Sequence, residues 1–190
     1  MYNIDVFDFD KTIYMGDSTL DFYIYCLKNN LLLFRFFPKQ FMYFIYYKFG
    51  KKSKLEFKQV FFSFLKGIKN VDEIIEKFWE KNFKKINMEI INRAENDIVI
   101  ISASPFFLLS PICKEIKCTK LIASNVEINT GIFNSDNCYG EEKVKRLNKE
   151  VKNYKIINFF SDSKSDIYLA RLSKNSYLVR GRKIEKWKII

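Results

Sequence analysis

The stretch NIDVFDFDKT, residues 3–12, places three aspartates in a segment otherwise patterned as a buried strand. Phe7 and Phe9 alternate with Asp8 and Asp10, and in a strand this alternation puts both aspartates on one side. Because an unpaired carboxylate is very costly to bury, such groups neutralise, pair or bind a metal. A strand over residues 3–9 that leads into a carboxylate site is therefore expected. Asp5 is expected to pair with a lysine at the other end of this strand.

Apolar β-branched runs alternate with helical patterns in the second half of the chain. Strands are predicted over 96–104, 119–124, 154–162 and 176–179, a hairpin over 125–133, and helices from Pro105, over 141–152 and over 166–172. This alternation predicts an α/β fold with a doubly wound, mostly parallel, Rossmann-like sheet. Such sheets bind ligands at the carboxyl ends of their strands.

Residues 17–96 have a helical pattern with few breakers, and 71–86 repeat apolar residues at helical spacing. We therefore expect a catalytic α/β core formed by residues 1–16 and 97–190, interrupted by an all-helical domain over 17–96. The length of 190 residues suits one domain with such an insertion.

Composition restricts the chemistry. The chain has no histidine, which excludes His-assisted Ser or Cys catalysis and histidine metal sites, so any metal is expected to be a hard cation held by oxygen. The four cysteines form no CxxC pair, and no basic leader precedes the first strand, as in a cytoplasmic protein with reduced thiols. The apolar window 31–50 is interrupted by polar residues and is too broken for a membrane span.

The net charge of +11 has two interpretations. It can indicate an anionic partner such as nucleic acid, an anionic membrane or a phosphorylated substrate. Because the lysines are spread along the chain, we assign most of the excess to a general drift in composition.

Four motifs follow one another along the chain: DFDKT, ISAS, a lysine within GEEK, and SDSKSD. In this order they resemble the signature of the haloacid dehalogenase superfamily, over the whole chain. The stretch ASNVEINTGIFNSDNCYGEEKVKRL also looks like the phosphoserine-phosphatase-like branch. The resemblance implies a phosphoric monoester hydrolase, with residues 17–96 as a helical cap that closes over the site.

The resemblance also implies roles for individual residues. Asp8 would be the nucleophile that forms an aspartyl-phosphate, and Asp10 the general acid and base. Mg²⁺ would be held by the side chains of Asp8 and Asp162 and by the backbone carbonyl of Asp10. Because family ATPases and dehalogenases lack an aspartate at the place of Asp10, this residue favours a hydrolase.

Other positions would support the phosphate. Ser102 and the backbone at Ala103 would bind its oxygens, and Lys143 would neutralise its charge. Asp166 would orient Lys143 or support the metal, and Thr12 would order the loop. The fourth motif departs from the family's Gly-Asp-Gly-x-x-Asp, since serines replace its glycines, which puts the fine geometry of that loop in question.

Two positions would select the substrate. Asp17 stands where phosphoserine phosphatases carry an acidic residue for the substrate amine. Phe61 stands where they carry an arginine for the carboxylate, and the neighbourhood FKQVFFSFLKG has no arginine. A phenyl ring cannot pair with a carboxylate, so phosphoserine is expected to be a poor substrate.

The aromatic residues of the expected cap, between residues 34 and 64, allow two interpretations. The favoured one places most of them in the core of a small bundle. The alternative is an exposed apolar face, flanked by Lys39, Lys48, Lys51 and Lys52, that contacts an anionic membrane peripherally. Because some relatives in the phosphoserine-phosphatase-like branch act on lipid phosphates, the resemblance then implies a phosphatidylglycerophosphate-like lipid phosphate as the partner, in place of a phosphorylated small molecule.

Two hypotheses of another class remain. A non-enzymatic basic binding protein would use the charge but has no need of the aspartates, and since no nucleic-acid module is recognisable, nucleic acid is not an expected partner. A receiver-type phospho-acceptor domain shares the aspartate, Mg²⁺ and lysine, but not the order of the motifs or the long helical insertion.

Overall fold

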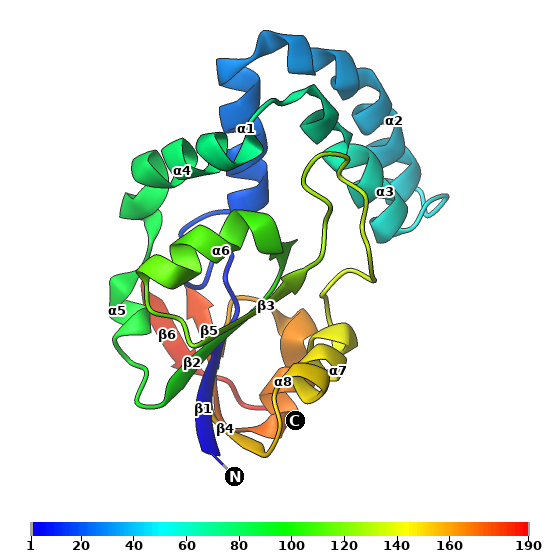
Figure 1. Ribbon diagram of the computed structural model, residues 1–190. Helices are drawn as coiled ribbons and strands as arrows, with labels where there is room; N and C mark the ends of the chain where they lie inside the picture. The colour runs from blue at the N-terminus through cyan, green and yellow to red at the C-terminus, as the bar shows by residue number, and fades with distance from the viewer. Residues whose placement is uncertain (1, 190) are drawn as a thin grey trace.

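The computed structural model describes residues 2–189, which form a six-stranded sheet with helices around it (Figure 1). The strands are β1 (Tyr2–Phe7), β2 (Asp97–Pro105), β3 (Lys120–Ser124), β4 (Tyr154–Ser161), β5 (Ser173–Arg180) and β6 (Lys183–Lys186). Their order is β3-β2-β1-β4-β5-β6; β1 to β5 are parallel and β6 is antiparallel to β5. The predicted α/β class with a mostly parallel sheet is confirmed.

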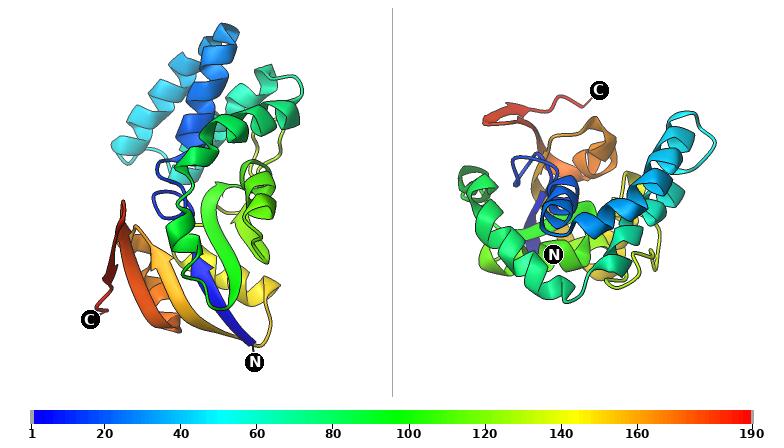
Figure 2. Two further views of the ribbon diagram at one scale, coloured as in Figure 1. Left: turned by 90° about the vertical axis from the view of Figure 1, so that its left-hand side faces the viewer. Right: turned by 90° about the horizontal axis from the view of Figure 1, so that it is seen from above.

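Helices cover both faces of the sheet, as parallel strands require. Helix α6 (Phe106–Glu115) packs on β2 and β3 from one side, and buries Leu108 and Ile112. Helices α7 (Glu141–Glu150) and α8 (Ile167–Leu172) pack on the opposite side, where Leu147 and Leu169 are buried, and the short helix η4 (Lys164–Asp166) precedes α8. Figure 2 shows these layers from two further directions.

The described elements between β1 and β2 are all helical, and we call residues 18–91 the helical insert. It comprises α1 (Ser18–Asn29), η1 (Leu31–Phe36), α2 (Phe37–Lys48), α3 (Lys54–Phe61), η2 (Phe62–Gly67), α4 (Val71–Asn82), η3 (Phe83–Lys85) and α5 (Met88–Ile91). Helices α1 to α4 stand beyond the carboxyl ends of the strands (Figures 1 and 2). The domain boundaries expected from the sequence stay a prediction.

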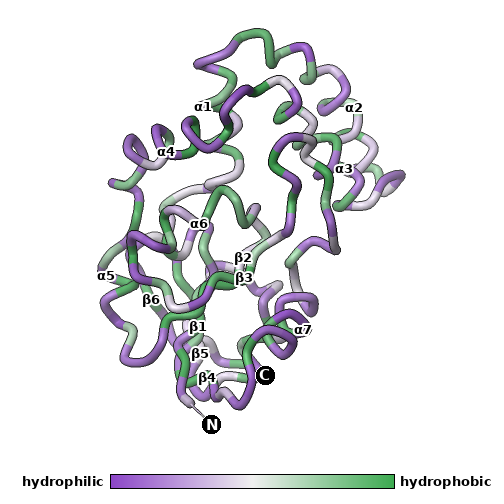
Figure 3. Tube along the Cα trace, viewed as in Figure 1, coloured by the Kyte–Doolittle hydropathy of each residue, from purple (hydrophilic) through white to green (hydrophobic). Residues whose placement is uncertain are grey.

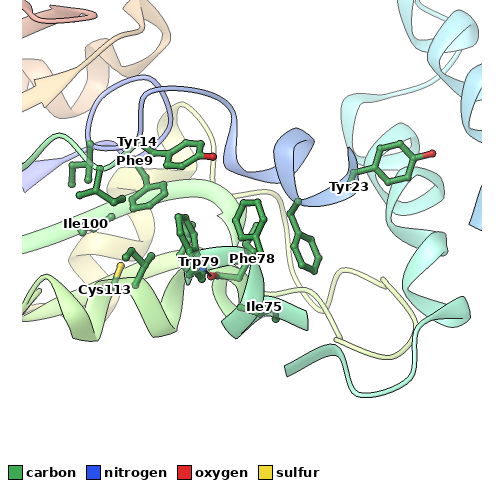
Figure 4. Close-up of a cluster of buried hydrophobic side chains, with 14 of the residues drawn as sticks. Phe9, Tyr14, Tyr23, Ile75, Phe78, Trp79, Ile100 and Cys113 are labelled. Atoms are coloured by element: carbon green, nitrogen blue, oxygen red, sulfur yellow. Dashed lines mark hydrogen bonds between the residues drawn. The ribbon is translucent and has the colours of Figure 1, made fainter. Parts of the chain in front are cut away.

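One aromatic cluster joins the insert to the sheet (Figure 4). Phe9 and Tyr14 follow β1, and Trp79 of α4 packs edge-on against both, with ring centroids 6.0 and 5.6 Å away. The Trp79 indole also donates a hydrogen bond of 2.7 Å to the carbonyl of Leu108 in α6. The base of the insert is therefore fixed beside the loop that follows β1.

The expected pairing of Asp5 with a lysine is wrong. Asp5 is fully buried, and its carboxylate accepts hydrogen bonds from backbone and side-chain amides of Asn158 and Asn96 and from the backbone N–H of Glu95, at 2.8–3.2 Å. The register of β1 and β4 shifts between Ile4 and Asp5. The sequence pattern shows a carboxylate in a strand, but not which amides surround it.

The end of the chain and the expected hairpin also differ from the prediction. Strand β6 follows β5 and closes the sheet, whereas the sequence analysis ends the sheet at residue 179. Residues 125–133 form a turn with one bridge, between Val126 and Phe133, and not a pair of strands. The backbone carbonyl of Phe62 lies against Gly131, so this turn packs on the insert.

The aromatic residues of the insert divide into two groups. Phe62 and Phe64 of η2 are buried, as the bundle-core interpretation expects. Phe34, Phe37, Phe41, Phe44 and Tyr46, in η1 and α2, are exposed, so that interpretation fails for most of α2. Figure 3 shows the mixture of apolar and hydrophilic residues along the insert. Within residues 2–189, none of the helices has the length and apolar character needed to cross a bilayer.

Candidate active site

Residues at the carboxyl ends of β1, β2 and β4 meet under the insert around a cavity of about 470 Å³. Nine of the ten site residues predicted from the sequence line it: Asp8, Asp10, Asp17, Phe61, Ser102, Ala103, Lys143, Asp162 and Asp166. The tenth, Thr12, is buried. Residues separated by more than 150 positions are thus brought together at the carboxyl edge of the sheet, as a parallel sheet predicts.

The turn after β1 orients the two aspartates of DFDKT. The backbone N–H of Asp8 still bonds to the carbonyl of Phe160 in β4, at 2.9 Å, so Asp8 continues the strand. The chain then turns, with the N–H groups of Ile13 and Tyr14 both bonded to the carbonyl of Phe9. This turn points the carboxylate of Asp10 towards the first residues of α1.

Asp10 is held by two donors, one at the start of α1 and one on β2. Its Oδ1 accepts the backbone N–H of Ser18 at 2.7 Å, and its Oδ2 accepts the hydroxyl of Ser104 at 2.5 Å. Burial raises the pKa of Asp10, and the nearby charge of Asp17 adds to this, while the two hydrogen bonds oppose it. A carboxyl group poised in this way can both give and take a proton.

Lys143 lies between two carboxylates in the floor of the cavity. It comes from the first turn of α7 and is 2% exposed. Its Nζ donates to Asp8 Oδ1 at 2.7 Å and to Asp166 Oδ2 at 2.8 Å. Burial alone would lower the pKa of Lys143, but the charges of Asp8 and Asp166 outweigh it and raise the pKa. Lys143 is therefore a permanent cation at neutral pH.

Negative charge still predominates around Lys143. The pKa of Asp8 is raised to about 7, by burial first and also by the charges of Asp166 and Asp10, against the attraction of Lys143. The pKa of Asp162 is also raised, by burial first, with Lys11 opposing. One lysine does not neutralise the carboxylates around it, and the site has the charge to attract a further cation.

The second motif contributes the wall opposite Asp8. Ser102 and Ser104 alternate on β2 and so share one side of the strand, and the Ser104 N–H donates to Ser102 Oγ at 3.1 Å. The carbonyl of Ala103 accepts the hydroxyl of Ser124 at 3.0 Å. Ser104 was missed in the sequence analysis, although its spacing from Ser102 places it on the same side.

The fourth motif is tied to the first through Thr12. The backbone N–H of Asp162 donates to Thr12 Oγ1 at 2.9 Å, which fits the ordering role expected for Thr12. Asp166 also accepts the hydroxyl of Ser161 at 2.8 Å, and its Oδ1 is buried without a hydrogen-bond partner. The serines that replace the family's glycines thus bond to this loop.

The site offers a small set of oxygen donors for a metal ion. Within residues 2–189, no three carboxylate, thiol or imidazole side chains converge closely enough to hold a metal by themselves. The expected set needs only two side chains, from Asp8 and Asp162, and one backbone carbonyl, from Asp10. Carboxylate and carbonyl oxygens suit Mg²⁺, and the unpartnered Oδ1 of Asp166 could accept a bond from a water of such an ion.

The insert supplies the roof of the cavity. Asp17 caps α1 by accepting the N–H of Leu20 at 2.9 Å, and it faces the same cavity as Phe61. Phe44 and Phe57 lie beside Phe61, which makes this wall apolar, and no arginine among the described residues lines it. Both residues named as substrate-selecting therefore reach the cavity, and their roles stay a prediction.

Lys58, like Ser104, is a cavity residue that sequence reasoning missed. Its Nζ donates to the carbonyl of Ala103 at 2.9 Å and to Asn137 Oδ1 at 2.8 Å, which ties α3 to the core. Within the described part of the chain, no carboxylate oxygen lies within 4.0 Å of Lys58 Nζ. Burial lowers the pKa of Lys58 to about 8. The signal was available, since Lys58 precedes Phe61 by three residues and so shares its helix face.

A larger depression of about 630 Å³ lies outside this site, between α6, β3 and α7. Three of the charged residues that line it are in short ion pairs: Arg146 bonds Glu142 at 3.1 Å, and Glu150 bonds Lys120, outside the lining, at 3.0 Å. This depression lacks the convergent carboxylates of the cavity under the insert. The cavity under the insert is therefore the candidate active site.

Comparison with known proteins gives a family and a fold. The family model described as haloacid dehalogenase-like hydrolase matches residues 6–171. No curated protein sequence matches the chain. Solved structures are similar in fold at low sequence identity.

Structures with a TM-score above 0.5 include the following three. A protein of unknown function from Bordetella pertussis Tohama I has a TM-score of 0.75 at 17% identity, over 93% of this chain and 89% of that one. A phosphoserine phosphohydrolase-like protein from Francisella tularensis subsp. tularensis SCHU S4 has a TM-score of 0.55 at 15% identity, over 93% and 86%. A probable phosphoserine phosphatase from Vibrio cholerae has a TM-score of 0.59 at 11% identity, over 92% and 55%.

Proposed function

Because this chain belongs to the haloacid dehalogenase-like hydrolase family, we propose that it hydrolyses a phosphate monoester through an aspartyl-phosphate on Asp8. The family membership expected from the motifs is thereby confirmed, and the interpretation as a non-enzymatic binding protein is set aside. The observation that carries the proposal is the position of Lys143 Nζ, 2.7 Å from Asp8 and 2.8 Å from Asp166, in a cavity that also holds Asp10.

The proposed reaction has two steps. The Asp8 carboxylate attacks phosphorus, the ester P–O bond breaks, and the leaving oxygen takes the proton of Asp10. Asp10, now ionised, takes a proton from water, which attacks the aspartyl-phosphate and releases inorganic phosphate and Asp8. Lys143 and Ser102 stabilise the charge on the phosphoryl oxygens in both steps, and Ser18 and Ser104 hold Asp10 in position.

Mg²⁺ fits the donors of this site. The side chains of Asp8 and Asp162 and the carbonyl of Asp10 would hold it, and the excess of buried carboxylates supports its presence. When bound, the ion would shield the phosphate from these carboxylates and polarise its oxygens.

The apolar roof indicates the substrate class. The description of the Francisella protein mentions phosphoserine, but here Phe61, Phe44 and Phe57 form the wall above the phosphate site. We therefore place the natural substrate outside phosphoserine, among phosphate monoesters with an apolar leaving group.

The first test is phosphate release from a panel of monoesters: phosphoserine, sugar phosphates, nucleotides, an aryl phosphate and a micellar lipid phosphate. We expect turnover that requires Mg²⁺ and stops with a chelator, with phosphoserine at least about tenfold below the best ester, because one lost charge-assisted contact costs this much. Absence of turnover on the whole panel by the folded protein would contradict the proposal, and rapid turnover of phosphoserine would overturn the substrate assignment.

Lys58 is expected to bind the anionic substrate, since it is a cavity cation with no carboxylate oxygen within 4.0 Å among the described residues. Lys58→Met should raise KM about tenfold and change kcat by less than about threefold, as expected for a lost charge-assisted contact. Lys69→Met makes the same change at an exposed position of the insert outside the cavity and should leave both constants unaltered. An unchanged KM for Lys58→Met would show that Lys58 only ties the insert to the core.

The same residue predicts a dependence on pH. The pKa of Lys58 is lowered to about 8 by burial and then by Lys54, while Asp10, Asp17 and Cys138 oppose the shift. As the pH rises through this value Lys58 loses its charge, so KM of the wild type should rise between about pH 7 and pH 9. This rise should be absent from Lys58→Met.

A lipid phosphate of the phosphatidylglycerophosphate type is the second candidate substrate. The exposed aromatic residues of α2 favour it, because Phe44 belongs both to this exposed set and to the cavity wall. In the panel, this candidate predicts that the micellar lipid phosphate exceeds every water-soluble ester.

A further inference from the structure

Helix α2 exposes a row of aromatic side chains. Phe37, Phe41 and Phe44 follow one another at spacings of four and three residues, which places them along one face of the helix. They are 47%, 51% and 39% exposed, and the rings of Phe37 and Phe41 stack with centroids 5.9 Å apart. We call these three residues the aromatic row.

The side of α2 next to the aromatic row is anchored by a polar residue. Gln40 is the buried residue of this helix; it accepts the Tyr23 hydroxyl at 2.5 Å and donates to the carbonyl of Phe61 at 2.8 Å. A surface helix of a globular protein normally buries its apolar residues and exposes its polar ones. In α2 the polar side chain of Gln40 is buried and the aromatic row is exposed. Exposed apolar surface of this kind marks an interaction site.

Flanking segments extend the exposed apolar surface. Leu31 and Leu32, in η1 just before α2, are 71% and 75% exposed. Phe49, directly after α2, is also highly exposed. The apolar exposure therefore continues beyond both ends of the helix.

The charge of this part of the chain has one sign. Between Lys28 and Leu55 there is no aspartate or glutamate, and the basic residues are Lys28, Arg35, Lys39, Lys48, Lys51, Lys52 and Lys54. Lys48 lies 5.5 Å from the ring centre of Phe44, so cations border the aromatic row itself. Apolar aromatic side chains with interspersed lysines match the interface of an anionic bilayer, where rings enter the headgroup region and cations meet the phosphates.

We propose that the aromatic row of α2 docks on the surface of an anionic lipid bilayer. A second copy of the chain fits this surface poorly, because a symmetric contact would bring two sets of lysines together without counter-charges. The insert would then lie on the membrane, with the sheet directed away from it.

The docked orientation has a consequence for the active site, which rests on the proposed phosphatase function. Phe44 ends the aromatic row and lines the cavity together with Phe57, whose ring centre is 5.6 Å away. An apolar path thus leads from the bilayer-facing side of α2 to the wall above Asp8. A lipid phosphate could enter along this path with its acyl chains still near the membrane.

The test is flotation of the full chain with vesicles of phosphatidylcholine alone and with about a third phosphatidylglycerol. We expect binding to the anionic vesicles at least about tenfold stronger than to the neutral ones, and a loss of binding at high salt. Phe37→Ser with Phe41→Ser should weaken anionic binding at least about tenfold, because each buried ring contributes strongly to membrane partition.

A matched double variant, Phe83→Ser with Tyr168→Ser, removes two aromatic residues that are equally exposed but lie outside α2, and it should bind like the wild type. Lack of binding to anionic vesicles, or equal binding by both double variants, would overturn the proposal. A dimer in solution that dissociates only in the α2 variant, without vesicle binding, would assign the surface to a second copy.

Flotation does not depend on catalysis, so the two proposals fail separately. Turnover of water-soluble esters without vesicle binding would leave the phosphatase and remove the docking surface. Vesicle binding without turnover of any ester would leave the docking surface and remove the phosphatase function.

Discussion

Asp8→Asn is expected to abolish phosphate release while the protein stays folded. An amide cannot attack phosphorus to form the acyl-phosphate, so turnover should fall at least about a thousandfold, as when a nucleophile is removed. The substitution keeps the size of the side chain and an acceptor for Lys143, which still pairs with Asp166. Phosphate release on the best ester of the panel measures the effect.

Two comparisons make this result specific to Asp8. Asp97→Asn changes the same group at an exposed position at the start of β2, far from the cavity, and should keep full activity. Inorganic phosphate should bind to Asp8→Asn at least as tightly as to the wild type, because a repelling carboxylate is gone. If Asp8→Asn retained a tenth or more of the activity, Asp8 would not be the nucleophile and a directly attacking water would take its place.

The success of the sequence analysis has a physical basis in the sheet. A parallel α/β sheet brings the carboxyl ends of its strands to one edge, so residues after β1, β2 and β4 had to meet wherever the strands were recognised. The strands themselves were recognisable because their β-branched runs are buried on both faces. For this reason Asp8, Ser102 and Asp162 could be assigned to one cavity without any tertiary information.

The wrong or missed predictions concern side chains that have several possible partners in the fold. Asp5 was expected to pair with a lysine, but in the fold it accepts amides of Asn158, Asn96 and Glu95, which the pattern of β1 alone does not reveal. Lys58 was one lysine among many in a basic chain. Its spacing from Phe61 is a sequence signal for the cavity, but the packing of α3 on the core is needed to single this lysine out.

The aromatic residues of α2 were misjudged for a different reason. Hydrophobic residues usually indicate a core, and composition does not tell which face of a helix is covered. Gln40 was the relevant position, because a polar residue that is buried and hydrogen-bonded turns the neighbouring aromatic face towards solvent. Where apolar residues outnumber the core positions available, the excess remains exposed, and here it forms a surface suited to docking.

Lys143→Met is expected to destabilise the fold strongly and in a pH-dependent way. The substitution leaves Asp8 and Asp166 buried beside one another without their shared cation. Removing one partner of a buried ion pair costs about 3–5 kcal/mol, and we expect a deficit of this size in the free energy of unfolding at about pH 8 in the presence of a chelator.

The direction of the pH dependence follows from the carboxyl groups left behind. Burial already raises the pKa of Asp8 to about 7 with Lys143 present, and without this cation the pKa must rise further. An acid whose pKa is higher in the folded than in the unfolded state destabilises the fold as the pH rises from the unfolded pKa through the folded one. The deficit of Lys143→Met should therefore shrink towards about pH 5, where the buried carboxyls can be neutral.

Lys145→Met is the matched control for this measurement. Lys145 lies on the same helix but is exposed, and its Nζ forms a long pair with Glu141, at 3.8 Å. The loss of Lys145 should therefore lower the free energy of unfolding by less than about 1 kcal/mol, with little dependence on pH. Denaturant unfolding of the three proteins across this pH range gives the comparison. If the free energy of unfolding of Lys143→Met were lowered equally at about pH 5 and about pH 8, the lysine would stabilise the fold by packing alone. The charge of Lys143 would then not be the reason that Asp8 and Asp166 can be buried together in the floor of the site.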